Sequence, residues 1–274
     1  MIARAGLGSR RELENWIEAG RVSVNGRIAS LGDRAAEGDL IRVDGRRIDT
    51  GTKHQNLRVL RYHKPVGVVC TRRDPEGRTT VFERLPQPRS GRWIAVGRLD
   101  INTSGLLLFT DSGDLANRLM HPSSRVARVY AVRIYGSPTP AVLKALGEGV
   151  QLDDGLAHFD TITDAGGEGR NHWYHVSVAE GRNRVVRRLW ESQNIEVSRL
   201  IRIGYGGLEL PRRLRPSRWE FLAGDELKTL LAAAGMESAP PRADSVAPAR
   251  RPPPGADPRS RRPGPRHQTK NRTR

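Results

Sequence analysis

The sequence has one cysteine, Cys70, in 274 residues, and only five of its 47 basic residues are lysine. A single cysteine excludes an internal disulfide and a zinc site built from several cysteines. No run approaches the roughly 18 consecutive apolar residues of a membrane-spanning helix. The first residues also lack an apolar stretch of signal-peptide length. We therefore expect a soluble, cytoplasmic protein.

Positive charge is what the chain has in excess. The formal net charge is +17, and 42 of the basic residues are arginine. Genome base composition can favour arginine over lysine, but it does not explain an excess of positive over negative residues. Such an excess indicates a polyanionic partner, most often nucleic acid.

Residues 1–48 predict a small domain of one helix followed by short strands. Ser9 and Glu12 have the spacing of a capping box, and Gly20 is placed to end the helix. The dipeptides Asn25-Gly26 and Asp44-Gly45 favour tight hairpin turns, because both residue types tolerate a positive φ. The core of such a unit is small, so its stability should be modest.

Two segments have the composition of chain without a packed core. Residues 49–56 are polar and predict a linker. Residues 237–274 predict a disordered basic tail, because from position 240 onward the chain has nine prolines, ten basic residues and two acidic ones. The tail is either a solubilising extension or a sequence-independent RNA tether.

Residues 57–236 predict the main domain, dominated by short strands that do not alternate regularly with helices. This pattern favours an α+β fold with a mixed, mainly antiparallel sheet. The expected strands are 59–62, 67–70, 93–96, 105–110, 126–135, 172–178 and 219–222. The expected helices are 115–120, 140–146, 182–192 and 225–234.

One loop of this domain holds the most informative pattern, Gly97-Arg98-Leu99-Asp100-Ile101-Asn102-Thr103-Ser104-Gly105-Leu106-Leu107-Leu108. Apolar strands lead into and out of it, so Asp100 falls between two buried elements. A carboxylate in that position is costly unless it is paired. From the residues alone, a turn held by polar side chains remains an alternative to a catalytic carboxylate.

The loop resembles the catalytic signature of the ribosomal RNA pseudouridine synthases that include the small-subunit enzyme A and the large-subunit enzymes B, E and F. Further matches follow in order along the chain: Lys64-Pro65-x-Gly67, Arg128-Val129-Tyr130, Glu180 to Arg188, and Val197-x-Arg199-Leu200-x-Arg202-Ile203. The front segment, from Ala5 to Gly26, resembles the small alpha-L (S-four) RNA-binding domain. Together these likenesses cover nearly all of residues 1–235.

The resemblance implies isomerisation of a uridine to pseudouridine, which needs no cofactor because no redox change or net hydrolysis occurs. It implies that Asp100 is the catalytic carboxylate and that Tyr130 stacks on the target base. Tyr130 lies in an alternating strand, on the side of Val132 and Ile134. Arg187 is our candidate for the cation paired with the carboxylate. We expect further side chains to bind the RNA or shape the pocket: Arg98, Lys64, Thr103, Ser104, Arg184, Arg188, Leu200, Arg10, Arg11 and Arg21. The target nucleotide must leave its helical stack to reach Asp100.

Helical spacing puts Arg184, Arg187 and Arg188 on one face of the helix predicted over 182–192. A solvated, phosphate-binding face is the alternative to a role at the carboxylate. His172 and His175 would point to opposite sides of a strand, and no histidine cluster has metal-ligand spacing, so we expect no metal.

Among the members of the family, the strand around Trp173 resembles most closely the B type of the large-subunit enzymes, which favours a uridine near the peptidyl-transferase centre of large-subunit RNA. We expect a monomer. Two other functions compete with this interpretation. A non-catalytic RNA-binding ribosome assembly factor would need the charge but not the Asp100 loop. A glycosidase-like hydrolase would need a second carboxylate, and only Asp111 and Asp114 lie nearby.

Overall fold

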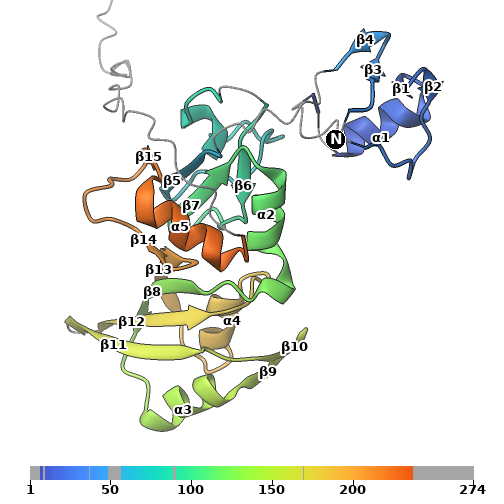
Figure 1. Cartoon of the computed structure of the whole chain (residues 1–274). Helices are drawn as coiled ribbons and strands as arrows, with labels where there is room; N and C mark the ends of the chain where they lie inside the picture. The colour runs from blue at the N-terminus through green and yellow to red at the C-terminus, as the bar shows by residue number, and fades with distance from the viewer. Residues whose placement is uncertain are drawn as a thin grey trace, which may run out of the picture. The chain divides into compact units, whose positions relative to one another are not determined.

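A computed structural model describes residues 7–8, 10–36, 38–48, 57–88, 91–168 and 170–236 of the chain (Figure 1). The expected N-cap at Ser9, the expected linker over 49–56 and the expected tail over 237–274 lie outside these residues. Within the described part, no helix is long and apolar enough to cross a membrane.

The N-terminal unit is one helix and a four-stranded sheet. Its elements are α1 (Arg10–Glu18), β1 (Val22–Val24), β2 (Arg27–Ile28), β3 (Ile41–Val43) and β4 (Arg46–Arg47), with strand order β2-β1-β3-β4. Both predicted turns are confirmed: φ is +51° at Asn25 and +86° at Gly26, and +50° at Asp44 and +76° at Gly45. Gly20, at φ +68°, follows the helix as predicted.

A small apolar cluster holds this unit together. Val22, Ile41 and Val43 are its buried strand residues, and Trp16 and Ile17 of α1 pack on it. Seven arginines of the unit are exposed: Arg11, Arg21, Arg27, Arg34, Arg42, Arg46 and Arg47. The unit therefore combines a minimal core with a densely basic surface.

The main domain is built on one large mixed sheet with the order β11-β12-β8-β13-β7-β5-β15, on which β6 pairs with β7 and β14 with β13. The pairing of β7 with β13 is parallel, and the other pairings are antiparallel. The strands are β5 (Val59–Lys64), β6 (Ile94–Val96), β7 (Ser104–Thr110), β8 (Arg128–Tyr135), β11 (Thr161–Glu168), β12 (Asn171–Val178), β13 (Val197–Tyr205), β14 (Leu208–Glu209) and β15 (Trp219–Phe221). The predicted α+β class with a mixed, mainly antiparallel sheet is confirmed.

Helices cover this sheet unequally. They are α2 (Gly113–Met120), α3 (Pro140–Glu148), α4 (Val185–Glu191) and α5 (Gly224–Ala233), with short 3-10 turns at Val81–Arg84 and Pro122–Ser124. Apolar residues of α3 and α4 join the core that includes Leu107, Tyr130 and Val132. Apolar residues of α2 and α5 join a second core, on the side of Leu106 and Leu108. Because neighbours along β7 point to opposite faces, the two cores lie on opposite sides of that strand.

The strands expected from the sequence pattern leave out β11, β13 and β14. They also leave out a hairpin of β9 (Val150–Leu152) and β10 (Gly155–Ala157), which stands apart from the large sheet. The β11 segment lacks a strand signature because it contains two adjacent glycines, Gly166 and Gly167, and a bulge between Asp164 and Gly167. A side chain on Gly167 would lie 2.2 Å from the Asn171 carbonyl oxygen. The strand expected over 67–70 is wrong, since that segment makes only an isolated bridge between Val69 and Thr80.

Candidate active site

The loop from Gly97 to Thr103 joins β6 to β7 and carries Asp100. The Thr103 amide donates to the Asp100 carbonyl oxygen at 3.0 Å, which closes a turn. The Gly67 amide donates to the Ile101 carbonyl oxygen at 2.8 Å and ties the turn to the segment after β5. Asp100 is half-buried, whereas Ile101 and Asn102 beside it are exposed. The carboxylate therefore sits on a turn that its neighbours hold through the backbone.

Gly105 shows why this motif needs a glycine. Its φ is +113°, and a Cβ there would lie 2.2 Å from the Arg202 carbonyl oxygen and 2.6 Å from the Arg202 amide nitrogen. Only glycine allows β7 and β13 to approach so closely. This close parallel pairing brings β13, and with it Leu200 and Arg202, beside the end of the Asp100 loop.

Lys64 supports the loop from inside. Its side chain has no exposed surface, and its ammonium donates to the carbonyl oxygens of Pro65 at 3.1 Å, Asp100 at 2.9 Å and Thr103 at 2.8 Å. Burial lowers the pKa of Lys64, and the nearby Cys70 and Asp100 act in the opposite direction. Lys64, one of the predicted RNA contacts, thus has all three of its donors bound to backbone beneath the loop.

Arg187 of α4 approaches the same loop from the side. Only 5% of it is exposed, and it donates from Nη1 to the Val197 carbonyl oxygen at 2.9 Å and from Nη2 to the Asn102 carbonyl oxygen at 3.2 Å. Burial lowers the pKa of Arg187, as does the nearby charge of Arg184, whereas Asp100 raises it. Among the described residues Arg187 forms no ion pair with Asp100, and it contacts the loop through the Asn102 carbonyl oxygen.

Sequence reasoning gave no role to Arg202, although it lies within a matched motif. The residue is 2% exposed, and its Nε donates to the Leu106 carbonyl oxygen at 2.7 Å. Its Nη2 is buried and has no hydrogen-bond partner among the described residues. The available signal was its spacing two residues after Leu200, which puts both side chains on one face of β13.

Lys64, Arg187 and Arg202 thus form a set that we call the buried cations. Together they donate to four carbonyl oxygens in and next to the loop, those of Asp100, Asn102, Thr103 and Leu106. Positive charge removed from water strengthens nearby electrostatic interactions, and the one carboxylate on this loop is that of Asp100. The arrangement holds the Asp100 loop in a fixed position beside positive charge.

Tyr130 and Leu200 lie on neighbouring strands beside this loop. The predicted alternation along β8 is confirmed, because Tyr130, Val132 and Ile134 are all buried. Tyr130 is 9% exposed and is the register partner of Arg202, while Leu200 is 4% exposed. Thr103 and Ser104, also predicted to act at the pocket, are buried at 2% and 7% exposure.

The shared face predicted for the three arginines around α4 is wrong. The helix begins at Val185, and Arg184 precedes it with φ +48°. Arg187 is buried, whereas Arg188 donates to both Asp154 oxygens at 2.9 and 2.8 Å and so fixes the β9–β10 hairpin. A left-handed residue before the first turn breaks the helical register on which the prediction depended.

The remaining predicted RNA contacts are basic side chains outside the buried cations. Arg98 and Arg11 are exposed. Arg184 is also exposed, and its Nη2 donates to Glu191 Oε1 at 3.4 Å. Arg21 is exposed and donates from Nε to Asp44 at 2.8 Å. Arg10 begins α1, and its side chain lies outside the described part of the structure.

The described residues contain no group of three or more histidine, cysteine and acidic side chains able to hold a metal ion. Cys70 is a free thiol that accepts from the Leu99 amide at 3.4 Å, next to Asp100. Burial raises the pKa of Cys70, so the neutral thiol is favoured there.

The fold and this site define a class of RNA-modifying enzymes. A solved structure described as a pseudouridylate synthase matches the chain's fold with a TM-score of 0.58 and 23% sequence identity, over 84% of this chain and 96% of that one. A family model described as RNA pseudouridylate synthase matches residues 58–192, and an S4 domain model matches residues 1–41.

Close relatives give a sharper assignment. The chain is 59% identical over 225 residues to "Ribosomal large subunit pseudouridine synthase B" of Escherichia coli (strain K12), covering 81% of this chain and 77% of the relative. It is 56% identical over 239 residues to the protein of the same description from Haemophilus influenzae, covering 86% and 67%. The chain therefore belongs to the RNA pseudouridylate synthase family and is an isomerase with an N-terminal S4 domain.

Proposed function

We propose that this enzyme converts a uridine of ribosomal RNA to pseudouridine, with Asp100 as the catalytic carboxylate. The observation that carries the proposal is the Asp100 loop itself, whose backbone is held by three buried cations while Asp100 is only half-buried. The relatives described as large-subunit synthases support ribosomal RNA as the substrate and favour the large subunit.

The proposed reaction breaks the bond from the ribose C1′ to N1 of uracil and forms a bond from C1′ to C5 of the same ring. The C5 proton is lost and N1 gains a proton, so the product is an isomer of the substrate. An ionised Asp100 serves either of two routes, a covalent adduct or removal of a sugar proton, and is regenerated in both. The chain's own contribution is to hold that carboxylate in place, next to the buried cations.

Tyr130 and Arg187 are the other two residues to which we assign roles. Tyr130 stacks on the flipped uracil and removes the C5 proton, a use suited to a ring that is buried along its body. Arg187 positions the loop through the Asn102 carbonyl oxygen and contributes positive charge near Asp100. Leu200 supplies an apolar wall next to Tyr130, and Arg98 faces solvent, where it can bind a phosphate beside the flipped nucleotide.

Within this proposal the domains divide the work. Residues 1–48 and their exposed arginines provide affinity for RNA of any sequence, and residues 57–236 provide the choice of base. Residues 49–56 join the two, and residues 237–274 are a basic extension. We further propose that the enzyme is a cytoplasmic monomer acting near the peptidyl-transferase centre, on free RNA or an assembly intermediate.

The test is to incubate the purified chain with unmodified large-subunit and small-subunit ribosomal RNA transcripts and to map pseudouridine in each. We expect modification of a single uridine, in the large-subunit transcript. Modification of the small-subunit transcript alone would overturn the assignment to the large subunit. Release of free uracil would instead support the glycosidase-like alternative.

A further inference from the structure

Among the described residues, no helix covers one half of the large sheet on the side away from Tyr130. Register partners connect Ser104 of β7 to Ile201 of β13, then to Ala131 of β8 and His175 of β12. Direct partners point to the same face of a sheet, so this row continues the face of Leu106 and Leu108. Helices α2 and α5 pack on that face at β5 and β7, whereas Figure 1 shows β12 and β11 with no helix in front of them.

We call the uncovered part the open face and define it by six residues: Trp173 and His175 of β12, Ala131 and Arg133 of β8, and Arg199 and Ile201 of β13. His175 and Arg199 are exposed, and Trp173 and Arg133 are half-buried. Trp173 and Arg133 are cross-strand partners, as are Arg133 and Arg199. An indole and two guanidinium groups therefore stand side by side across three strands.

Arg133 is held in a fixed position next to the indole. Its Nε donates to the Ser198 hydroxyl at 2.9 Å, and that hydroxyl donates back to the Arg133 carbonyl oxygen at 3.1 Å. The guanidinium carbon lies 5.9 Å from the centre of the Trp173 ring, within cation–π range. A flat surface is thus ready before any ligand binds, which reduces the entropy that binding must overcome.

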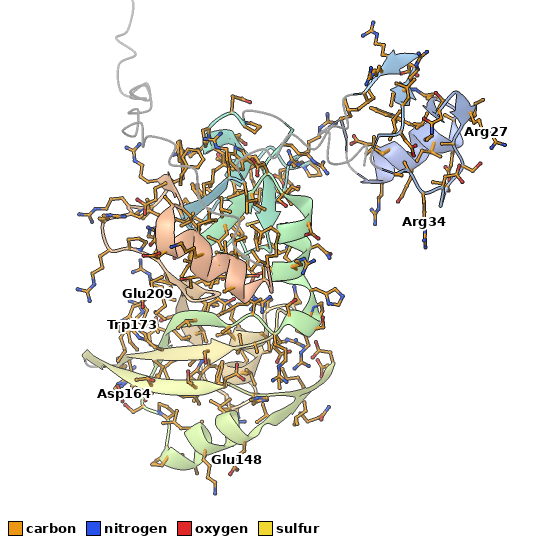
Figure 2. All side chains as sticks on the ribbon, in the orientation of Figure 1. Arg27, Arg34, Glu148, Asp164, Trp173 and Glu209 are labelled. Carbon is orange, nitrogen blue, oxygen red and sulfur yellow. The ribbon has the colours of Figure 1, made fainter. Side chains whose placement is uncertain are left out.

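A hollow of about 580 Å³ opens beside this pair, lined by Arg133, Ala165, Gly166, Gly167, Asn171 and Trp173. The bulged part of β11 lines one side of the hollow, and Gly166 and Gly167 there have no side chains to fill it. In the view of Figure 2, Trp173 lies between Glu209 of β14 and Asp164 of β11. The bulge leaves room for a planar group next to the indole.

Charge distinguishes the covered and open parts of this face. Under α5, Arg61 of β5 donates to Glu220 and Glu226 at 2.6 Å each, so its charge is neutralised. On the open face, neither Arg133 nor Arg199 forms an ion pair with any described residue. Asp164 of β11 is the partner of Tyr174 on the opposite face and is bound to His172 at 2.7 Å. Glu209 of β14 is exposed on the same side as Ala131, and no ion pair joins it to Arg133 or Arg199 within the described residues.

We propose that the open face is a second RNA-binding surface, on which an unpaired stretch of the substrate RNA stacks a base on Trp173 and places phosphates on Arg133 and Arg199. Uncompensated arginines favour a polyanion, and an aromatic ring on an open sheet is a platform on which unstacked bases bind. This inference rests on the proposed function only for the identity of the ligand. It adds a contact on the face opposite Tyr130, outside the catalytic machinery.

The test measures the affinity of the full chain for an unmodified large-subunit RNA transcript, in an Asp100→Asn background so that no turnover occurs. Trp173→Ala should weaken binding about tenfold, a typical effect of losing one stacked base, and Trp173→Phe should restore most of it. Arg133→Ala with Arg199→Ala should reduce the slope of log affinity against log salt by roughly 1.4, since each single-strand phosphate contact contributes about 0.7. Arg213→Ala, an exposed arginine paired with Glu220, is the matched control and should change neither quantity.

In the active enzyme, the same open-face variants should keep the wild-type rate at saturating RNA, because they do not touch the Asp100 loop. Unchanged affinity and salt slope would overturn the proposal. A doubled mass of the wild type in light scattering, lost in Trp173→Ala, would then identify the face as a contact between two copies of the chain. Because binding is measured without turnover, failure of the proposed reaction would not be mistaken for failure of this surface.

Discussion

The buried cations and the exposed arginines of the N-terminal unit use the same charge in opposite ways. Lys64, Arg187 and Arg202 are at most 5% exposed and donate to backbone carbonyl oxygens around one loop. The arginines of residues 10–48 that are described face solvent over a small core. Burial turns a cation into a fixed positioning group, whereas exposure leaves it as a mobile, salt-screened attraction for RNA. We therefore expect that replacing a buried cation alters the reaction rate, and that replacing an exposed arginine of the N-terminal unit alters the affinity for RNA.

The largest effect on stability should come from replacing Gly105, because the close approach of β7 and β13 at this residue places Arg202 beside the Asp100 loop. Gly105→Ala should destabilise the fold by about 3–5 kcal/mol, because the new Cβ meets backbone at 2.2 Å and φ is positive. Gly97→Ala is the matched control in the same loop: its φ is +78°, but no atom lies within 4 Å of the added Cβ. It should cost only about 1–2 kcal/mol. Urea unfolding measures both, and equal losses would contradict the close-approach argument.

Arg187→Met should lower the single-turnover rate at saturating RNA by about 10²–10³, the typical cost of losing one preorganised electrostatic group. Its affinity for RNA should stay within about threefold of the wild type, because the side chain does not face solvent. Arg187→Lys should recover part of the rate. The control is Arg61→Met, an equally buried arginine paired with Glu220 and Glu226, which should affect stability and leave the rate unchanged.

A smaller loss of rate, about tenfold, should follow Arg202→Met. Methionine fills similar space but cannot donate to the Leu106 carbonyl oxygen, so the start of β7 becomes less fixed. Replacing a buried arginine that lacks a carboxylate partner should cost little stability, since its desolvation penalty disappears as well. A normal rate in this variant would remove Arg202 from the positioning set.

The smallest effect on rate should come from the exposed side. Replacing Arg11, Arg27 and Arg34 together by alanine should leave the rate at saturating RNA unchanged and weaken affinity most at low salt. The salt slope should fall by one to three, depending on how many of the three contact phosphates. A large fall in rate at saturating RNA would show that exposed arginines also affect the reaction step, and it would contradict the different roles expected for buried and exposed cations.

Much of the fold was predictable because its signals are local. Hairpin dipeptides set the turns of the N-terminal unit, and alternation along β8 placed Tyr130 inward. Gly166 and Gly167, next to the bulge, hid β11, because a glycine-rich strand presents no alternating pattern. Tertiary structure also overrode the helical spacing around Arg187, since α4 starts after a left-handed residue.

The candidate site was predictable only in part. The motif identified the Asp100 loop, but not that Lys64 and Arg202 hold it through carbonyl oxygens contributed by distant segments. Such contacts join residues tens of positions apart and leave no spacing to detect in the sequence. Resemblance was needed to separate a catalytic carboxylate from a turn former, because the loop residues alone suit both.

We propose that the Asp100 carboxylate, held in place by the buried cations, carries out the isomerisation. The most direct measurement is single-turnover tritium release from large-subunit RNA labelled at C5 of uridine, with RNA affinity measured in parallel, for the wild type and Asp100→Asn. We expect release by the wild type and none by Asp100→Asn, with RNA affinity kept within about threefold because the amide has the same shape. Release by Asp100→Asn at the wild-type rate would contradict it and move the reaction to another residue.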